Sequence, residues 1–433
     1  MADDTIRGVL PPVIQPLVSD FFDKPKVKET RATCHECAMC NHGQASPVPM
    51  DYFLDATKCC TYFPQLPNYL VGAILADEGA DMAEGKRRVR EVIADRKGTL
   101  PLSLTRPRKM TFLMSNYADS FGRARSLLCP YYNSESPEYA CTIWRHREAV
   151  CMTYYCKYEA GQRGYDFWTA LKDYLFFVQR VLARAAAAAV DPKVKEPKFK
   201  NLQMTPEDMD DAPPKRSDYA AWWGKWVGRE EEWYRKTYEW VTKFVPRADF
   251  KTNIDDSAEG KKLYDGVVSA YSKLENKVLP ATLVKNARMK EQHVGGQVVV
   301  TTYHRFDSFA LDKELYEVVG LFKPEQTLAE NLQRLAKEEG IELAPELIEY
   351  LFAAGILVEP TPAVVASATA PPKEALAELR GKRAALRAIL DARSITLGPG
   401  DSTRIDDADT ATLDTWIKRA AVATTFTELL EVG

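Results

Sequence analysis

The sequence predicts a mainly α-helical protein built from several units. All nine cysteines of the 433-residue chain lie between Cys34 and Cys156, and two later stretches rich in proline separate the rest into segments. Within those segments apolar residues recur mostly at three and four, which places them on one face of an α-helix. A single β-branched run, at 298–304, interrupts this helical pattern.

The cysteines are grouped at spacings typical of metal ligands. Thiols separated by two residues are a recurrent metal signature, and three of them in one polar stretch cannot all face a core. A disulfide framework is typical of secreted domains, whereas the first residues contain no signal peptide, so we expect reduced thiols and a cytoplasmic protein. We interpret residues 1–190 as a cysteine-rich metal-cluster domain. Its candidate ligands are Cys34, Cys37, Cys40, Cys59, Cys60, Cys129, Cys141, Cys151 and Cys156.

Two kinds of metal centre fit these thiols. Zinc takes four thiolate or histidine ligands, so nine cysteines fill two sites with one thiol to spare. Iron–sulfur clusters also take four cysteines, and Cys34-x2-Cys37-x2-Cys40 matches the first three ligands of the bacterial ferredoxin pattern. Aromatic residues near the later cysteines would form a dry shell that tunes a cluster. They are Tyr131, Tyr132, Trp144, Tyr154 and Tyr155. We favour iron–sulfur, as [4Fe–4S], over zinc, and both stay open.

These cysteine motifs resemble the CxxCxxCC family of zinc- or iron-chelating proteins (YkgJ-like), of which flagellin lysine N-methylase is a larger relative. The resemblance covers about residues 30–160, and its most specific part is the phrase CPYY…CTIWRHREAVC. Two places depart from the family. Asn41 stands where a fourth cysteine would follow directly, with the Cys59-Cys60 pair further on, and Glu148 stands where the family has proline. The resemblance implies a bound metal in a bacterial protein.

A long helix is predicted after the last cysteine. Its apolar residues recur at helical spacing, so it should lie across the metal-cluster domain. They are Phe167, Leu171, Tyr174, Leu175, Val178 and Leu182. Residues 191–216 are charged and proline-rich and are predicted as a linker. An aromatic helical segment, 217–290, follows. Its first helix would carry four indoles on one stripe and pack through them onto the metal-cluster domain. They are Trp222, Trp226, Trp233 and Trp240.

Residues 291–360 have the pattern of a small winged-helix module. The strand at 298–304 precedes three helices, the second opened by a capping box at Thr327 and the third by Pro345, and a last strand follows Gly355. The phrases GLFKPEQTLAENL and ELIEYLFAAGILVEP are similar to PqqD-type winged helices, which implies peptide binding. The third helix carries glutamates instead of a basic face, so we expect a protein or peptide partner and no nucleic acid.

The remaining residues are predicted as a second linker, 361–372, and a C-terminal helical unit, 373–433, that contacts a partner. A formal net charge of −3 gives no electrostatic footprint for nucleic acid, and no apolar run reaches the roughly 18 residues of a membrane span.

The sequence contains no phosphate-binding loop, dinucleotide fingerprint or His-Glu-x-x-His motif that would name a reaction. Two function classes remain. One is a redox or protein- or peptide-modifying enzyme component with an iron–sulfur cluster. The other is a structural-metal adaptor or regulator that binds a polypeptide without catalysis.

Overall fold

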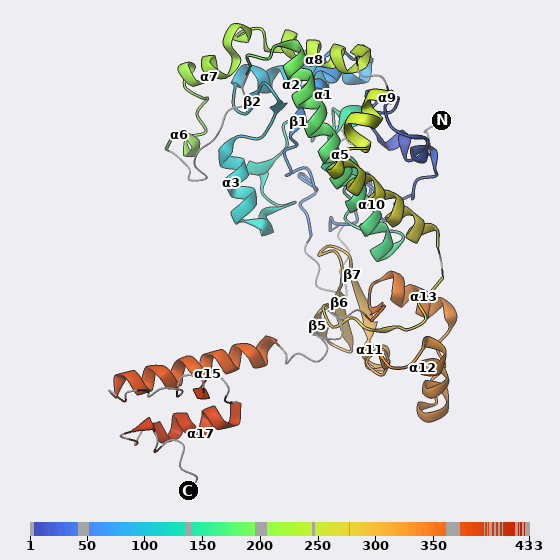
Figure 1. Ribbon diagram of the computed structural model, residues 1–433, viewed down its shortest axis with the longest axis vertical. Coiled ribbons are helices and arrows are strands. Elements are labelled where there is room, and N and C mark those ends of the chain that lie inside the picture. The colour runs from blue at the N-terminus through green and yellow to red at the C-terminus, as the bar shows by residue number, and fades with distance from the viewer. Residues whose placement is uncertain are drawn as a thin grey trace. The chain divides into compact units, whose positions relative to one another are not determined.

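The computed structural model forms two compact units, Met1–Glu359 and Pro360–Gly433. It describes residues 4–41, 52–135, 141–194, 206–244, 247–276, 278–360, 373–393, 395, 397, 401, 404, 405, 408, 410–420, 423, 425, 426 and 428. The predicted mainly α-helical fold is confirmed, because helices make up most of both units and the sheets are small (Figure 1).

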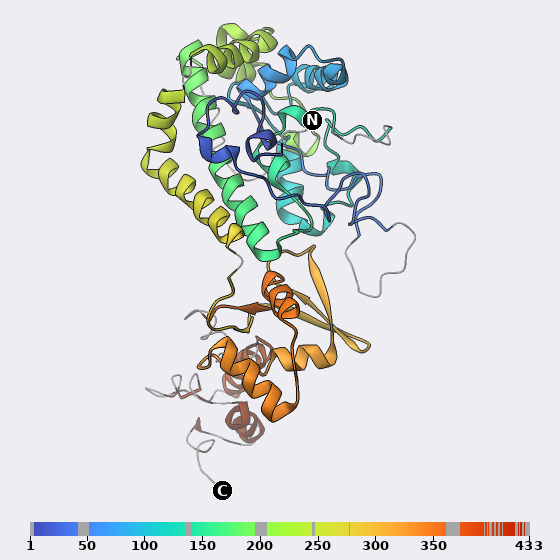
Figure 2. The ribbon, with the colours of Figure 1, turned by 90° about the vertical axis from the view of Figure 1, so that its right-hand side faces the viewer.

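The first unit is organised around one long helix. Helix α5 (Gly161–Val190) buries all six of the apolar residues that predicted it. It packs against α10 (Ala258–Glu275), and the two lie side by side in both ribbon views (Figures 1 and 2). The other face of α5 meets α8 (Glu230–Phe244), which also packs along α1 (Asn68–Ala76).

The aromatic segment is two helices joined by a turn, so the prediction of one continuous stripe is wrong. Helix α7 (Arg216–Trp223) stops at a turn that contains Gly224 and Gly228, both with positive φ, before α8 begins. Glycine adopts this backbone conformation without strain, which explains the break. The predicted packing is nevertheless observed. Trp223 and Trp233 donate hydrogen bonds to backbone carbonyls of residues 99 and 101 in the cysteine-rich region.

Residues that sequence analysis treated as separate segments therefore share one core. A single buried cluster combines Tyr131 and Ile143 of the cysteine-rich region with Trp223, Trp233 and Tyr234. The beginning of the predicted linker is packed as well, because the Asp191 carboxylate accepts hydrogen bonds from neighbouring side chains and is 7% exposed. The middle of that linker, 195–205, lies outside the described residues.

The cysteine-rich region itself consists mainly of short elements and turns. A three-stranded antiparallel sheet has the order β1–β3–β2, and the nine cysteines lie mostly in the irregular chain around it. The elements are β1 (Leu66–Pro67), α2 (Ala83–Asp95), β2 (Thr99–Leu100), β3 (Ser103–Leu104), α3 (Arg108–Asn116) and α4 (Ala149–Thr153). Two short helices come later in the chain, namely α6 (Pro206–Met209), which lies within the predicted linker, and α9 (Arg247–Phe250).

Residues 278–360 form a sheet module at the N-terminal end of α5 (Figure 2). The predicted strand is β6 (Gln297–Thr301), the centre of an antiparallel meander β5–β6–β7 with β5 (Lys290–Val294) and β7 (Ser308–Asp312). The predicted capping box at Thr327 is confirmed, as is Pro345 in the first turn of a helix. The remaining elements are β4 (Val284–Lys285), α11 (Lys313–Val319), α12 (Leu328–Arg334), α13 (Pro345–Ala353) and β8 (Leu357–Val358), which pairs with β4.

The sheet module is tied closely to α5. A Cβ on Gly161 would lie 1.9 Å from the backbone oxygen of Ala353, so the start of α5 and the end of α13 touch backbone to backbone. Arg163 donates hydrogen bonds to the carbonyl oxygens of Asn276 and Val278 at the junction. These contacts fix one end of the module against the helix that follows the cysteines.

The second unit contains α15 (Lys373–Ala392) and α17 (Thr410–Ala420), which pack against each other through Leu386, Leu390 and Leu413. The predicted linker 361–372 lies outside the described residues. Among the helices in the described part of the chain, none combines the length and the apolar character needed to cross a membrane.

Candidate metal centre

None of the nine cysteines forms a disulfide, and they come from five separate segments of the chain. Their side chains are neighbours across these segments. The thiol of Cys34 lies near that of Cys59, Cys59 near Cys60, and Cys40 near Cys37. The backbone N–H of Cys129 donates to the carbonyl oxygen of Cys60 at 2.7 Å. The cysteines that the sequence grouped by spacing therefore form one continuous patch of thiols.

We describe this patch as two sets, which Cys60 connects because it neighbours Cys59 and lines the same cavity. The first thiol set surrounds Cys37, whose neighbours include the thiols of Cys40, Cys59 and Cys156. We define it as Cys34, Cys37, Cys40, Cys59 and Cys156. Burial and the neighbouring Cys37 raise the pKa of Cys156 to about 12, because a thiolate there would be poorly solvated and would face a second sulfur.

The second thiol set consists of Cys60, Cys129, Cys141 and Cys151. Cys60 lies near Cys129 and Cys141, and Cys151 near the same two thiols. Burial, with the charge of Glu148 and of these thiols, raises the pKa of Cys151 well above its usual range. Four crowded thiols with raised pKa values suit a cation, since a bound cation offsets both the repulsion and the lost solvation of thiolates.

A cavity of about 50 Å³ opens beside the thiols. Five cysteine side chains line it together with aromatic rings and one lysine. They are Cys34, Cys37, Cys59, Cys60 and Cys156, accompanied by Phe53, Tyr154, Tyr155 and Lys58. The first thiol set thus contributes most of the sulfur in the cavity wall, and Cys40 is not part of that wall. Solvent or a small ligand reaches the patch from this side.

Whether these residues can hold a metal depends on the number and the positions of their thiols. Two groups, of five and four thiols, contain the eight sulfur ligands that two zinc or iron–sulfur centres require, with one thiol to spare. In the part of the chain that the structure describes, no three histidine, cysteine, aspartate or glutamate side chains converge on one point where an ion could sit. Ligation would require rotation of thiols whose segments are already adjacent.

The aromatic shell differs in part from the prediction. Tyr131 and Tyr132 are buried, and Tyr154 and Tyr155 line the cavity, but Trp144 is 56% exposed and belongs to the surface. Trp144 stacks against the guanidinium of Arg147 instead. Phenylalanines that spacing did not point to complete the shell. Phe53, Phe121 and Phe306 stack edge-on or face-on with one another next to the first thiol set.

The motif Arg145-His146-Arg147-Glu148 has distinct roles at each position. His146 is buried and hydrogen-bonded to Asp77, which also pairs with Arg145, so these two side chains face away from the thiols. Arg147 lies close enough to the thiolates to lower the pKa of Cys141, partly offsetting the larger effect of burial. Of the other histidines near cysteines, His35 is exposed and His42 lies outside the described residues.

Glu148 stabilises the start of the helix that follows the motif. It caps α4, accepting hydrogen bonds from the N–H groups of Val150 at 2.8 Å and Cys151 at 3.0 Å. The first N–H groups of a helix have no partner within it, so a side-chain cap stabilises its start. Glu148 thereby fixes the orientation of the helix that carries Cys151.

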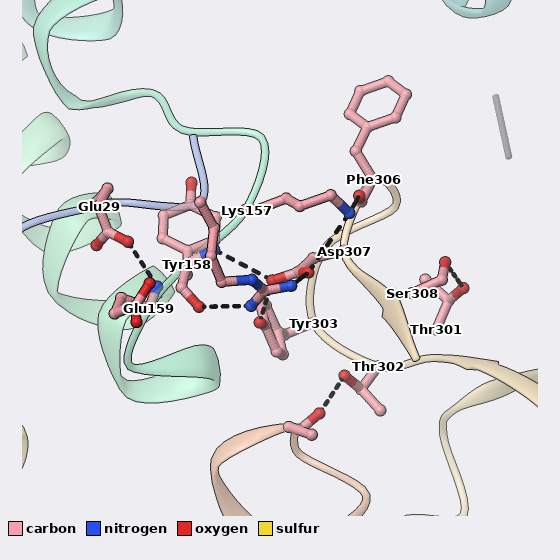
Figure 3. A network of polar contacts seen from close by, with 12 residues as sticks. Glu29, Lys157, Tyr158, Glu159, Thr301, Thr302, Tyr303, Phe306, Asp307 and Ser308 are labelled. Atoms are coloured by element: carbon pink, nitrogen blue, oxygen red, sulfur yellow. Dashed lines mark hydrogen bonds and ion pairs between the residues drawn. The ribbon is translucent and has the colours of Figure 1, made fainter. Parts of the chain in front are cut away.

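Sequence reasoning missed the loop between β6 and β7. Phe306 packs against Cys37 and Cys40, and His304 stacks among Tyr154, Tyr158 and Tyr165. Asp307 (Figure 3) is fully buried and pairs with Arg31. These residues follow the last cysteine by far more than any ligand spacing, so no motif could have found them. The only signal was that the predicted strand ends in a histidine.

No protein-family profile matches the chain, and neither the curated proteins nor the solved structures include a match. The resemblance to the YkgJ-like family therefore rests on the cysteine motif and the residues between Cys129 and Cys156.

Proposed function

We propose that the cysteine patch holds metal, with iron–sulfur clusters favoured over zinc, and that the chain is a redox or protein- or peptide-modifying enzyme component. One observation carries the proposal, namely that nine thiols from five segments meet in one aromatic-lined region. A buried thiol cluster without a cation loses solvation and gains only weak hydrogen bonds. An iron–sulfur cluster, when bound, would supply one-electron transfer.

The sheet module supports a polypeptide partner. It resembles a PqqD-type winged helix in its helices and capping residues, and α13 carries Glu346 and Glu349 where a nucleic-acid reader needs basic residues. Its outer strand β5 is largely exposed, so backbone groups at that edge are accessible to a peptide. We propose that this module and the second unit bind protein or peptide, and that the protein is cytoplasmic, since clustered thiols of this kind are expected to stay reduced there.

The alternative is a structural-metal adaptor or regulator that binds a polypeptide without catalysis. Zinc in the same thiols would cross-link the five segments and supply no redox chemistry. The spread of the cysteines over five segments of the unit fits such a cross-link.

Anaerobic purification of the full chain separates these proposals. Iron, acid-labile sulfide and zinc would be quantified per chain, and the visible spectrum recorded before and after dithionite. We expect iron and sulfide in equal amounts with broad visible absorbance that bleaches on reduction. A colourless protein with stoichiometric zinc would favour the adaptor. A chain that binds neither metal would refute both proposals.

A further inference from the structure

Asp307 is a buried carboxylate at the end of the β6–β7 loop, and its side chain is fully inaccessible to solvent. It accepts hydrogen bonds from Arg31 at 2.8 Å, from the hydroxyl of Tyr303 at 2.5 Å and from the backbone N–H of Tyr158 at 3.1 Å. The ammonium of Lys157 lies 3.8 Å away (Figure 3). A buried charge with this many partners is costly to disturb, because removing it leaves its partners uncompensated.

The residues that meet at Asp307 flank two cysteines of the first thiol set. Arg31 lies three residues before Cys34, and Lys157 follows Cys156 directly. Arg31 also donates to the carbonyl oxygen of Tyr158 at 3.1 Å, and Lys157 donates to that of Phe306 at 2.9 Å. One carboxylate from the sheet module therefore joins the two chain segments that bring these cysteines to the patch.

The segment before Cys34 has a second anchor. Glu29 accepts hydrogen bonds from the indole of Trp168 and from the backbone N–H of Glu159, both at 2.6 Å. These bonds attach the segment to α5 independently of Asp307. Loss of the Asp307 carboxylate would consequently loosen the chain near Cys34 and Cys156 without releasing it from the unit.

The second thiol set is held by different contacts. Cys141 pairs with Tyr132 in an isolated antiparallel bridge, Cys151 sits in α4 behind its Glu148 cap, and Cys129 is bonded through its backbone to Cys60. A change at Asp307 should therefore act on one set of thiols and spare the other.

We propose that Asp307 is a positioning residue for the first thiol set, holding the Cys34 and Cys156 segments together through Arg31 and Lys157. The sheet module is then a structural part of the candidate metal centre. This inference rests on the proposed metal function for its purpose, while the positioning itself can be measured on the metal-free chain.

The test is pulsed alkylation of the metal-free full chain, read cysteine by cysteine with mass spectrometry. In Asp307→Asn, we expect Cys156 to react about tenfold faster, as a local opening made easier by about 1.4 kcal/mol would give. Cys34 is already exposed, so its rate should rise less. Cys129 and Cys151 should react at the wild-type rate. Equal acceleration of all four thiols, or no acceleration, would overturn the proposal.

Two further variants keep the test decisive. Tyr303→Phe removes one hydrogen bond to Asp307 and keeps the ring, so it should raise the alkylation rate of Cys156 by less than Asp307→Asn does. This variant also serves as the test if Asp307→Asn does not fold. Asp119→Asn breaks an exposed ion pair, 3.2 Å long, between Asp119 and Arg305 of the same loop. It should leave the rate at Cys156 unchanged, and acceleration there would count against a specific role for Asp307.

The metal-loaded protein gives a second readout, the reduction potential of the centre. If the first thiol set holds an iron–sulfur centre, loss of the nearby carboxylate favours the reduced state, so its reduction potential should rise in Asp307→Asn. One outcome would refute the positioning role alone. In it, the wild type binds metal, while Asp307→Asn has unchanged alkylation rates and an unchanged reduction potential. Selective acceleration in a chain that never binds metal would refute the proposed function and leave the positioning role standing.

Discussion

Cys40 differs from the other cysteines of the first thiol set. Its thiol hydrogen-bonds to Asp55 and Cys37, and its side chain is absent from the wall of the cavity. Burial and the neighbouring Cys37 raise its pKa. Since a centre with four sulfur ligands leaves one thiol of this set unused, Cys40 is the best candidate for the spare cysteine.

Serine substitutions should reveal this division. Cys37→Ser, Cys156→Ser and Cys151→Ser should each lose about half of the bound metal, because each removes a ligand from one of two four-ligand centres. Cys40→Ser should keep the full amount. Metal per chain, measured after anaerobic purification, decides the outcome. Full metal content in the first three variants would remove these cysteines from the list of ligands.

The Asp77–His146 pair should make stability depend on pH. Burial lowers the pKa of His146 below its ordinary 6.5, with Asp77 opposing this effect. Burial of Asp77 would raise its pKa, but hydrogen bonds from His146, Gly79 and Arg145 lower it from 3.8 to about 2. Both groups therefore bind protons more readily in the unfolded chain, so folding is favoured at higher pH.

The directions of these two pKa shifts define two pH ranges in which stability is lost. The contribution of His146 is complete above pH 6.5 and is lost as pH falls toward its folded pKa, and that of Asp77 is lost between 3.8 and about 2. Chemical denaturation of His146→Gln should show a weaker fall in stability than wild type as the pH drops below 6.5. The matched control His35→Gln, at an exposed position, should keep the wild-type fall. Identical profiles for wild type and His146→Gln would contradict this assignment.

Among the elements, the contact between α1 and α8 depends on one glycine. A Cβ on Gly72 would lie 2.0 Å from the backbone oxygen of Tyr234, a distance that no packed methyl group tolerates. The two helices thus approach backbone to backbone, and α8 places Trp233 and Tyr234 into the core beneath the thiols. Small residues permit this approach, while larger ones force helices apart.

Gly72→Ala should destabilise the first unit by about 1–3 kcal/mol, the usual cost of overpacking. Gly266→Ala in α10 is the matched control, because its Cβ would meet nothing within 4 Å. It should stabilise the helix by about 0.5–1 kcal/mol, the usual gain from glycine to alanine within a helix. Thermal unfolding of both variants compares them directly. A neutral Gly72→Ala would mean that the α1–α8 contact adjusts freely.

Elements were predictable where a local pattern is strong. The apolar spacing of α5, the capping box of α12 and the β-branched run of β6 are all visible in the sequence. Strand β5 was missed because its side chains are mostly polar and exposed, so they show no alternation of apolar and polar residues. The prediction of one tryptophan stripe was wrong because Gly224 and Gly228 interrupt the helix between the tryptophans.

At the scale of the whole molecule, we expect that residues 1–190 do not fold as an independent domain. A fragment ending at residue 190 lacks α8, α10 and Asp307, and so exposes core residues such as Tyr69 and Trp168. We expect it to precipitate or to unfold without a cooperative transition. A fragment of residues 1–359 should keep the metal content and unfolding transition of the full chain. A soluble, metal-bearing fragment 1–190 would show that the later helices are dispensable.

The nine candidate ligands could be named from the sequence, because clustered cysteines carry their own spacing signal, and their binding of metal stays a prediction. The residues that support them could not be named in this way. The division of the cysteines into two sets, and the contribution of Phe306 and Asp307, depend on how distant segments pack. A single buried acid far from any motif looks like any other acid in the sequence, because its partners are set by tertiary contacts.

The distance along the chain between Arg31 and Asp307 bears on how the protein is made. These partners are 276 residues apart. At translation rates of about 5–20 residues per second, Asp307 emerges from the ribosome roughly 15–55 seconds after Arg31. During that interval the first thiols exist without the carboxylate that arranges their segments. Under the proposed positioning role, the first thiol set reaches its final arrangement only after the sheet module has been translated, and until then its thiols are exposed to oxidation.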